Sequence, residues 1–165
     1  MEEQVEVVDE GGKVLRIVPR SVMREENLRH KSTVILVFNS KGEVFIHKRS
    51  MEKDVFPGVY DIFCGGVVGA GESFDEAAKR ELAEELGIGD AEPKFLFKYR
   101  YKDDKTSNFF HVYSAIYDGL IEFRDGEIDE GFFMPLEKVE GFMAKNPFAP
   151  DTKAVFERYK EFHGV

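Results

Sequence analysis

The segment from Ser73 to Gly87 constrains this chain most strongly, because it specifies a helix with both of its ends marked. Ser73 and Glu76 form the pattern of a capping box, in which the serine hydroxyl accepts a hydrogen bond from the amide three residues on and the glutamate reaches back. Gly87 follows the last leucine, and helices often end on a glycine in the left-handed conformation. We therefore predict a helix over residues 73–86.

The apolar face of this predicted helix carries charge. At 3.6 residues per turn, its alanines and leucines at positions 77, 78, 82 and 86 form one arc. Glu81 and Glu85 fall inside that arc, within about 20° of Phe74, and Glu84 flanks it. Charged helix faces are usually solvated, but two unpaired carboxylates against a core would each cost several kcal/mol. A divalent cation would resolve the conflict, since carboxylates at i, i+3 and i+4 converge within one turn and suit a hard ion.

The composition is typical of one globular domain. Of the 165 residues, 42% are hydrophobic and 33% are charged, so the chain can bury a core and is too apolar to be disordered throughout. No repeat or Pro/Ser-rich linker divides it, and we expect a single domain over residues 1–165. The one cysteine, Cys64, excludes a disulfide framework and a four-cysteine zinc site, and it favours a reducing compartment.

Charge and hydropathy restrict the partners and the compartment. The net charge of −9 disfavours a nucleic-acid surface and an anionic membrane as partners. No apolar run approaches the length of a membrane span, and the acidic N-terminus lacks the apolar core of a signal peptide. We expect a cytoplasmic protein that does not cross a membrane. The oligomeric state stays open, a homodimer included.

The remaining elements follow from hydrophobic periodicity and turn residues. The apolar run from Thr33 to Phe38 predicts a strand buried on both faces. Residues 1–30 predict a hairpin followed by a short helix at 21–29. Mixed strands with helices on the faces favour an α+β sandwich. We expect strands at 4–8, 13–18, 33–38, 43–49, 61–64, 94–102, 107–117, 119–123 and 131–134, and a final helix at 151–162.

The stretch from Gly66 to Ile88 resembles the Nudix box, G-x5-E-x7-R-E-U-x-E-E-x-G-U, where U is aliphatic. A match at every specified position has a small false-positive risk. Phe56–Tyr60, Gly65–Gly66 and Glu127–Glu130 further resemble the branch related to isopentenyl diphosphate isomerase. The matched positions of the box are Gly66, Glu72, Arg80, Glu81, Leu82, Glu84, Glu85, Gly87 and Ile88.

The resemblance implies a fold and a reaction. It implies an α/β/α sandwich with a mixed β-sheet between helices. It also implies hydrolysis of the diphosphate (pyrophosphate) bond of a nucleoside diphosphate linked to another moiety, by attack of water on phosphorus. The cofactor would be Mg2+, with Mn2+ as a substitute, and the partner would be a small nucleotide or diphosphate substrate. Phosphoryl transfer depends on charge neutralisation and in-line positioning, which agrees with a cluster of carboxylates.

The resemblance also implies roles for the residues of the box. Glu84 and Glu85 would bind the metal, and Glu81 would be a ligand or the base that deprotonates water. Gly66 would offer its backbone carbonyl to a metal, and Arg80 would orient a glutamate of the box.

Further candidates lie beside and beyond the box. Glu72 would be structural or an outer-sphere metal ligand. Glu127 or Glu130 would supply a catalytic base, because Nudix proteins often take it from an acidic residue in a later loop; otherwise they belong to an ordinary acidic loop. Lys48 and Arg49 end a strand and would bind a substrate phosphate, unless they are merely solvated.

Two other functions remain in view. The isomerase's catalytic cysteine corresponds to Gly65, one residue from Cys64, and a shift of one residue turns a side chain to the other face of a strand. Its histidine corresponds to Val67, so isomerase activity is disfavoured and Cys64 reads as a small buried hydrophobe. A non-catalytic binding module would be expected to lose box carboxylates, and none is lost. The substrate, the catalytic base and the number of metal ions stay open.

Overall fold

The sheet is built around the apolar run of the sequence, which forms β3 (His30–Phe38) in the computed structural model, where residues 1–164 are described. Its interior residues are buried on both faces, as predicted. β3 pairs in parallel with β8 (Ser107–Ile116) along its whole length and antiparallel with β6 (Cys64–Val67). β7 (Lys94–Lys102) adds to the outer side of β8.

A second group of strands diverges from β3. β4 (Glu43–Arg49) pairs with β3 only at Phe38 and Val44, next to the turn that joins them. β4 pairs with β9 (Ile128–Pro135) along its whole length, and beyond its contact with β3 it pairs with β5 (Tyr60–Asp61). The sheet therefore forks between β3 and β4, and the space inside the fork is lined by both strands.

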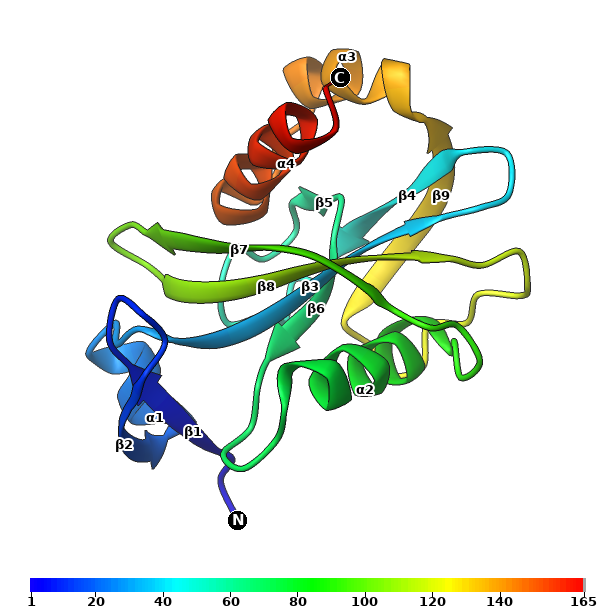
Figure 1. Ribbon diagram of the computed structural model, residues 1–165. Helices are drawn as coiled ribbons and strands as arrows, with labels where there is room; N and C mark the ends of the chain where they lie inside the picture. The colour runs from blue at the N-terminus through cyan, green and yellow to red at the C-terminus, as the bar shows by residue number, and fades with distance from the viewer. Residues whose placement is uncertain (165) are drawn as a thin grey trace.

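Helices cover both faces of the sheet (Figure 1). α2 (Phe74–Leu86) packs on one face through Leu82 and Leu86, while α3 (Val139–Lys145) and α4 (Pro150–His163) pack on the other, next to the short 3-10 turn Leu136–Lys138. The expected α+β sandwich with a mixed sheet is confirmed. Within residues 1–164, no helix combines the length and hydropathy of a membrane span.

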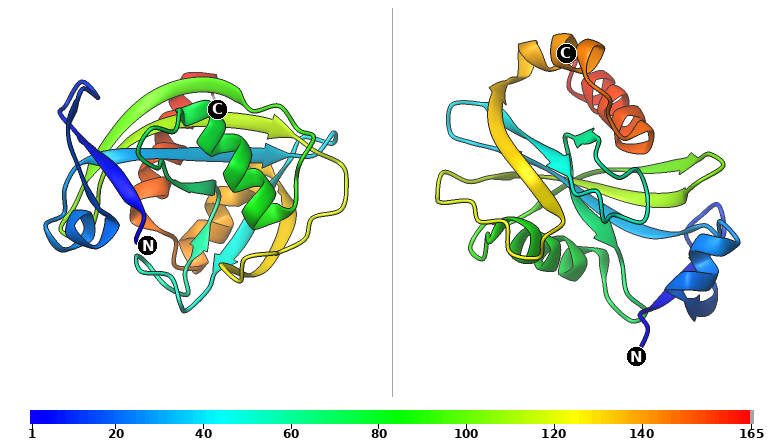
Figure 2. Two further views of the ribbon diagram at one scale, coloured as in Figure 1. Left: turned by 90° about the horizontal axis from the view of Figure 1, so that it is seen from below. Right: turned by 180° about the vertical axis from the view of Figure 1, so that it is seen from behind.

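The N-terminal segment stands at one end of the sheet (Figure 2). β1 (Gln4–Val8) and β2 (Val14–Pro19) form the predicted hairpin, and α1 (Arg20–Glu25) follows directly. β1 continues the sheet through the pair Val7–His30. A small core that includes Met23 and Val67 joins this segment to β6, so the segment is packed against the site-forming strand.

Three expected elements differ from the structure, and one helix was not expected. The strand expected at 61–64 is two short strands, β5 and β6, that pair with β4 and β3 respectively. Residues 119–123 form no strand, and 136–145 form the 3-10 turn and α3, which the sequence did not predict. These segments are short, and their structure depends on distant partners more than on local periodicity. The helix expected at 21–29 covers only 20–25.

Candidate active site

The helix of the Nudix box is α2. It is capped by Ser73 and Gly87, and the face predicted to be apolar is the one that is buried. The Ser73 hydroxyl accepts from the amide of Glu76 at 3.0 Å, and Gly87 ends α2 at φ +69°. Glu84 is exposed, on the edge of the buried face. The buried residues of α2 are Ala77, Ala78, Glu81, Leu82, Glu85 and Leu86. Two carboxylates therefore lie on the face that packs against the sheet.

Glu81 and Glu85 are buried beside each other. Their residues are 7% and 3% exposed. Burial raises the pKa of both carboxyl groups, and the neighbouring Glu81 raises the pKa of Glu85 further. The amide of Gly65 donates to Glu85 Oε1 at 3.0 Å, which fixes this carboxylate against β6. The pair carries more negative charge than its surroundings compensate.

Glycines let β6 approach these carboxylates. A Cβ on Gly66 would stand 2.5 Å from Glu81 Oε1, and a Cβ on Gly65 would collide with the carbonyl oxygen of Thr33 on β3. Glycine at position 66 therefore leaves room for the Glu81 carboxylate, and glycine at position 65 lets β6 lie close to the backbone of β3. The Gly65–Gly66 backbone is thus part of the wall around the carboxylates.

Arg80 connects the carboxylates to the loop before the helix. Its guanidinium binds Glu72 bidentately, with Nε–Oε2 at 2.7 Å and Nη2–Oε1 at 2.9 Å. Nη1 donates to Glu81 Oε1 at 2.9 Å and to Glu84 Oε2 at 3.1 Å. Glu72 in turn accepts from the Gly69 amide at 3.0 Å. Arg80 therefore holds the glutamates in place, and Glu72 holds Arg80.

The donor set fits a divalent cation. Carboxylate oxygens are the ligands that Mg2+ prefers, and a cation would relieve the repulsion between Glu81 and Glu85. Within residues 1–164, no three His, Cys, Asp or Glu side chains already stand close enough together to hold a metal ion. Glu84 instead contacts Arg80. Metal binding would therefore turn the Glu84 side chain toward its two neighbours on the same helical turn.

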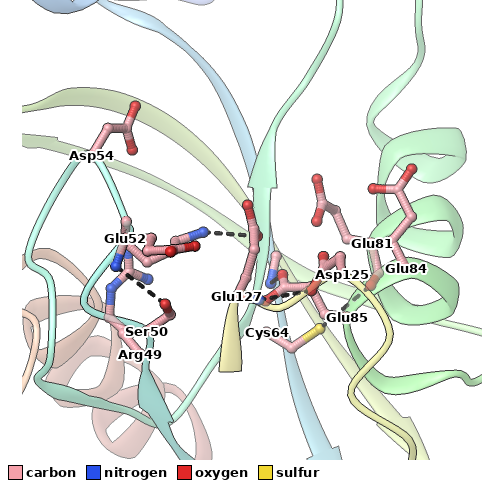
Figure 3. A network of polar contacts seen from close by, with 12 residues as sticks. Arg49, Ser50, Glu52, Asp54, Cys64, Glu81, Glu84, Glu85, Asp125 and Glu127 are labelled. Atoms are coloured by element: carbon pink, nitrogen blue, oxygen red, sulfur yellow. Dashed lines mark hydrogen bonds and ion pairs between the residues drawn. The ribbon is translucent and has the colours of Figure 1, made fainter. Parts of the chain in front are cut away.

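Two adjoining spaces open beside these residues. Figure 3 shows Glu81, Glu84 and Glu85 on α2 beside Asp125 and Glu127 from the chain that leads into β9. The carboxylate pocket contains Glu81 and Glu84 and faces the loop before β9. The deep cavity lies in the fork of the sheet and contains Glu85. The carboxylate pocket is lined by Glu3, Arg20, Lys53, Gly65, Gly66, Val67, Arg80, Glu81, Glu84, Asp125 and Glu127. The deep cavity is lined by residues that include Arg20, Arg24, Ser32, His47, Arg49, Lys53, Asp54, Asp61, Gly65, Gly66, Glu85, Asn108 and Asp151.

The structure brings some of the predicted residues together and separates others. Glu127 lines the carboxylate pocket opposite α2, and its carboxylate contacts Lys53 Nζ at 2.8 Å. Glu130 instead accepts from the Tyr60 hydroxyl at 3.0 Å, and Lys48 Nζ lies 6.0 Å from the centre of the Tyr60 ring. Neither Glu130 nor Lys48 is among the residues that line the two spaces, because side chains alternate along β4 and β9.

Arg49 lines the deep cavity, but its guanidinium is already engaged. It donates to the carbonyl oxygens of Val55 and Phe56 at 2.8 and 3.0 Å, and it contacts Asp61 at 3.4 Å. These bonds shape the loop between β4 and β5. Arg49 thus lines the cavity while it also holds that loop.

Several residues of the site escaped the sequence analysis. Arg20 and Lys53 line both spaces, and Asp125 lines the carboxylate pocket. His47 lines the deep cavity, is 2% exposed and has no hydrogen-bond partner at Nδ1 among the described residues; burial lowers its pKa to about 4. No motif marks these positions. The alternation of β4, which places His47 on the face opposite Lys48, was the one available signal.

Cys64 belongs to the core between the sheet and α2. It is 2% exposed and packs with Leu82 and Ile35. Burial raises the pKa of its thiol, with the charges of Glu85 and Glu81 adding to the effect. A thiol in these surroundings is protonated and inert.

Comparison with known proteins shows the family to which the sequence is related. The family model described as "NUDIX domain" matches residues 28–159. An uncharacterized Nudix hydrolase of Streptomyces coelicolor is 36% identical over 166 residues, covering 99% of this chain and 92% of that protein. The uncharacterized Nudix hydrolase YfcD of Escherichia coli K12 is 30% identical over 150 residues, covering 91% of this chain and 82% of YfcD.

Solved structures share the fold. DR0079 from Deinococcus radiodurans superimposes with a TM-score of 0.80 at 26% identity, covering 94% of this chain and 98% of that one. The NUDIX domain of Shewanella oneidensis NrtR, solved as a complex with ADP ribose, superimposes with a TM-score of 0.64 at 19% identity, covering 79% and 86%. On its sequence and its fold, the chain belongs to the Nudix hydrolase family.

Proposed function

We propose that this protein hydrolyses the diphosphate bond of a nucleoside diphosphate linked to another moiety, with Mg2+ as the cofactor and Mn2+ as a substitute. One observation carries the proposal: Glu81 and Glu85 lie buried side by side against Gly65 and Gly66, where the carboxylate pocket and the deep cavity meet. Burial and mutual repulsion make such a pair costly without a cation. A cation held by the pair would relieve that repulsion and neutralise the charge of a bound diphosphate.

The residues of the site would have different roles in this reaction. Glu81, Glu84 and Glu85 would hold the metal, and the Gly66 backbone would complete its surroundings. The metal, when bound, supplies positive charge against the phosphate oxygens and lowers the pKa of water. Arg80 orients Glu81 through the 2.9 Å contact of Nη1 with Oε1.

Proton removal from water has two candidates. Glu127 faces α2 across the carboxylate pocket, and its partner Lys53 keeps it in place. Glu81 is the alternative, because its carboxylate lies among the metal ligands. We favour Glu127, since a residue that binds Arg80 and a metal ion has less freedom to accept a proton. Glu130 is disfavoured because it contacts Tyr60 outside the pocket.

The two spaces suggest how a substrate would be divided. The diphosphate would lie where the carboxylate pocket and the deep cavity meet, with one phosphate group beside the metal ligands. The deep cavity would take the remainder, because its wall offers neutral hydrogen-bonding groups: the Ser32 hydroxyl donates to Asn108 Oδ1 at 2.7 Å, and Asn108 Nδ2 donates to the Thr106 hydroxyl at 2.8 Å. The ADP ribose in the complex of Shewanella NrtR supports a substrate of this class.

A hydrolysis screen tests the proposed function. The protein is incubated with a panel of nucleoside diphosphate derivatives, with Mg2+ or with EDTA, and phosphate is measured after phosphatase treatment. We expect turnover of at least one compound with Mg2+ and none after dialysis against EDTA in metal-free buffer. Turnover that survives metal removal, or no turnover of any compound with Mg2+ or Mn2+, would refute the proposal.

The resemblance to the isomerase branch does not carry over to isomerase chemistry. Cys64 is enclosed in the core, with its Sγ 3.9 Å from the backbone oxygen of Glu81. The position that corresponds to the isomerase's catalytic cysteine is Gly65, where no side chain fits. A non-catalytic module is disfavoured as well, because every carboxylate of the box is present and three of the four are held in one network by Arg80.

A further inference from the structure

The segment that precedes the matched family domain forms part of the site. The family model begins at residue 28, whereas Arg20 and Arg24 belong to α1. Both arginines nevertheless line the deep cavity, and Arg20 also lines the carboxylate pocket. Lys53, from the loop between β4 and β5, lines both spaces as well. Arg20 and Lys53 therefore place two cations where the spaces meet.

A single loop carboxylate is shared between the two arginines. Asp54 Oδ2 accepts from Arg24 Nε at 3.0 Å and lies 3.4 Å from Arg20 Nη2. Arg20 completes its contacts with Glu3, at 3.0 Å. The two guanidiniums are thus paired with two carboxylates, Glu3 and Asp54, and Asp54 contacts both arginines. A phosphate group, with two negative charges and three acceptor oxygens, offers the two arginines more partners than the single Asp54 carboxylate does.

In two of these ion pairs the basic side chain is more buried than its acidic partner. The side chains of Arg24 and Lys53 are 22% and 13% exposed, whereas those of Asp54 and Glu127 are 45% and 41% exposed. A carboxylate that is nearly half exposed is readily rehydrated when it leaves the arginines, and an incoming phosphate would keep the buried cations paired. An anion that enters the cavity can therefore replace the Asp54 carboxylate at small cost.

We propose that Arg20, Arg24 and Lys53 bind phosphate groups of the substrate, and that Asp54 occupies this position only in the free protein. The N-terminal segment is then a wall of the substrate site. The proposal rests on the proposed function for the identity of the anion, a diphosphate. Arg20 would contact the diphosphate near the metal ligands, and Arg24 would contact phosphate oxygens deeper in the cavity.

The first test measures binding of inorganic pyrophosphate to the full chain by isothermal titration calorimetry, with and without Mg2+. We expect Arg24→Gln to weaken binding at least tenfold. The control is Arg16→Gln, because Arg16 lies on β2 of the same segment but pairs with Glu26 at the surface. Its affinity should stay within twofold of the wild type. Equal affinities of the Arg24 variant and the wild type would overturn the proposal.

The second test uses the opposite sign expected for Asp54. If this carboxylate competes with the ligand, Asp54→Asn should bind pyrophosphate several-fold more tightly than the wild type. If Asp54 merely fastens the loop that carries Lys53, the substitution should weaken binding, and that result would overturn the proposal. Should Arg24→Gln fail to fold, as judged by circular dichroism, Asp54→Asn decides the question together with Arg24→Lys, which should bind more weakly than the wild type.

Steady-state kinetics separate this proposal from the proposed function. On a compound that the wild type hydrolyses, Arg24→Gln should raise KM tenfold or more and leave kcat within a few-fold. Unchanged KM and kcat would refute the phosphate-binding role while the hydrolase function stands. Arg24-dependent binding of pyrophosphate without hydrolysis of any compound would refute the proposed function and leave the binding role standing.

Discussion

Asp151 is a buried carboxylate at the start of α4, where it lines the deep cavity. Burial, with a smaller contribution from the charge of Asp61, raises its pKa from 3.8 to about 6. A carboxyl group whose pKa is higher in the folded than in the unfolded chain stabilises the fold while it is protonated. That contribution is complete below pH 3.8 and is lost as the pH rises through about 6.

We therefore predict that Asp151→Asn becomes more stable than the wild type as the pH rises. The amide keeps the shape of the side chain and cannot ionise. From the shift of the pKa, the difference in the free energy of unfolding should reach about 2–3 kcal/mol at pH 8 relative to pH 4. Urea unfolding of both proteins across this range provides the measurement. Parallel stability curves would show that Asp151 titrates as it does in the unfolded chain.

Cys64 illustrates a residue whose chemistry is suppressed by its packing. Removal of its sulfur in Cys64→Ala leaves a small cavity between the sheet and α2, which should cost about 1–2 kcal/mol of stability. Hydrolysis should stay within twofold of the wild type, because the thiol contacts the core rather than the carboxylate pocket. Unfolding by urea and a steady-state assay check the two effects. A thousandfold loss of turnover in a folded variant would revive a cysteine-based reaction.

At the scale of the element, the two ends of α2 have different roles: the first turn stabilises the helix, and the last two turns carry the candidate metal ligands. Its first turn carries the cap, and its last two turns carry Glu81, Glu84 and Glu85. Because the glutamates are fixed by Arg80 and by the Gly65 amide, their position depends on contacts outside the first turn. A substitution in the first turn of α2 should therefore change stability with little effect on catalysis.

We predict that Ser73→Ala destabilises the fold by about 1 kcal/mol, because the amide of Glu76 loses the acceptor that caps it. The value of kcat should change by less than threefold. Ser73→Asp is the matched control, since a carboxylate caps the same amide and should restore stability. Urea midpoints and steady-state kinetics give both quantities. A fall of kcat in the Ala variant that the Asp variant reverses would show that the cap also positions the glutamates.

At the scale of the whole molecule, the site opposes the stability of the fold. Glu81 and Glu85 are buried like charges, and β6 lies against Glu81 at Gly66, where a side chain would meet the carboxylate. A ligand stabilises the state that binds it. The protein should therefore gain stability from Mg2+ through the same carboxylates that destabilise it without the metal.

We predict that the double variant Glu81→Gln, Glu85→Gln melts at or above the wild-type temperature in EDTA, gains no stability from Mg2+ and does not hydrolyse substrate. The amides keep the shape and remove the repulsion and much of the desolvation cost. Thermal unfolding with and without Mg2+ is measured beside the hydrolysis assay. Glu76→Gln, on the exposed side of the same helix, should respond to Mg2+ as the wild type does.

Two results would contradict this prediction. A double variant that melts well below the wild type in EDTA would show that the carboxylates stabilise the fold as ion-pair partners, as the contact of Glu81 with Arg80 would allow. A variant that melts normally and still hydrolyses substrate would place the metal site on another face of the helix.

Local patterns in the sequence were sufficient to predict the helices and strands whose residues follow a regular hydrophobic period. The period of 3.6 residues and the caps at Ser73 and Gly87 defined α2 and the burial of Glu81, because the angle between successive side chains depends on the helix alone. The strands at 4–8, 43–49 and 94–102 have the predicted bounds. The Nudix box is contiguous, so its residues were readable without knowledge of the fold.

The tertiary structure alone decided which distant residues share the site. Arg20, Lys53 and Asp125 are far apart in the sequence and meet because β3 and β4 diverge from the Phe38–Val44 pair onward and the N-terminal segment packs against β6. Long-range strand pairing and loop packing set these positions, and neither leaves a periodic signal. The sequence by itself determined the helix, its buried carboxylates and the family, since these depend on neighbouring residues. The cations that face the carboxylates depend on contacts between distant segments, which form only in the folded chain.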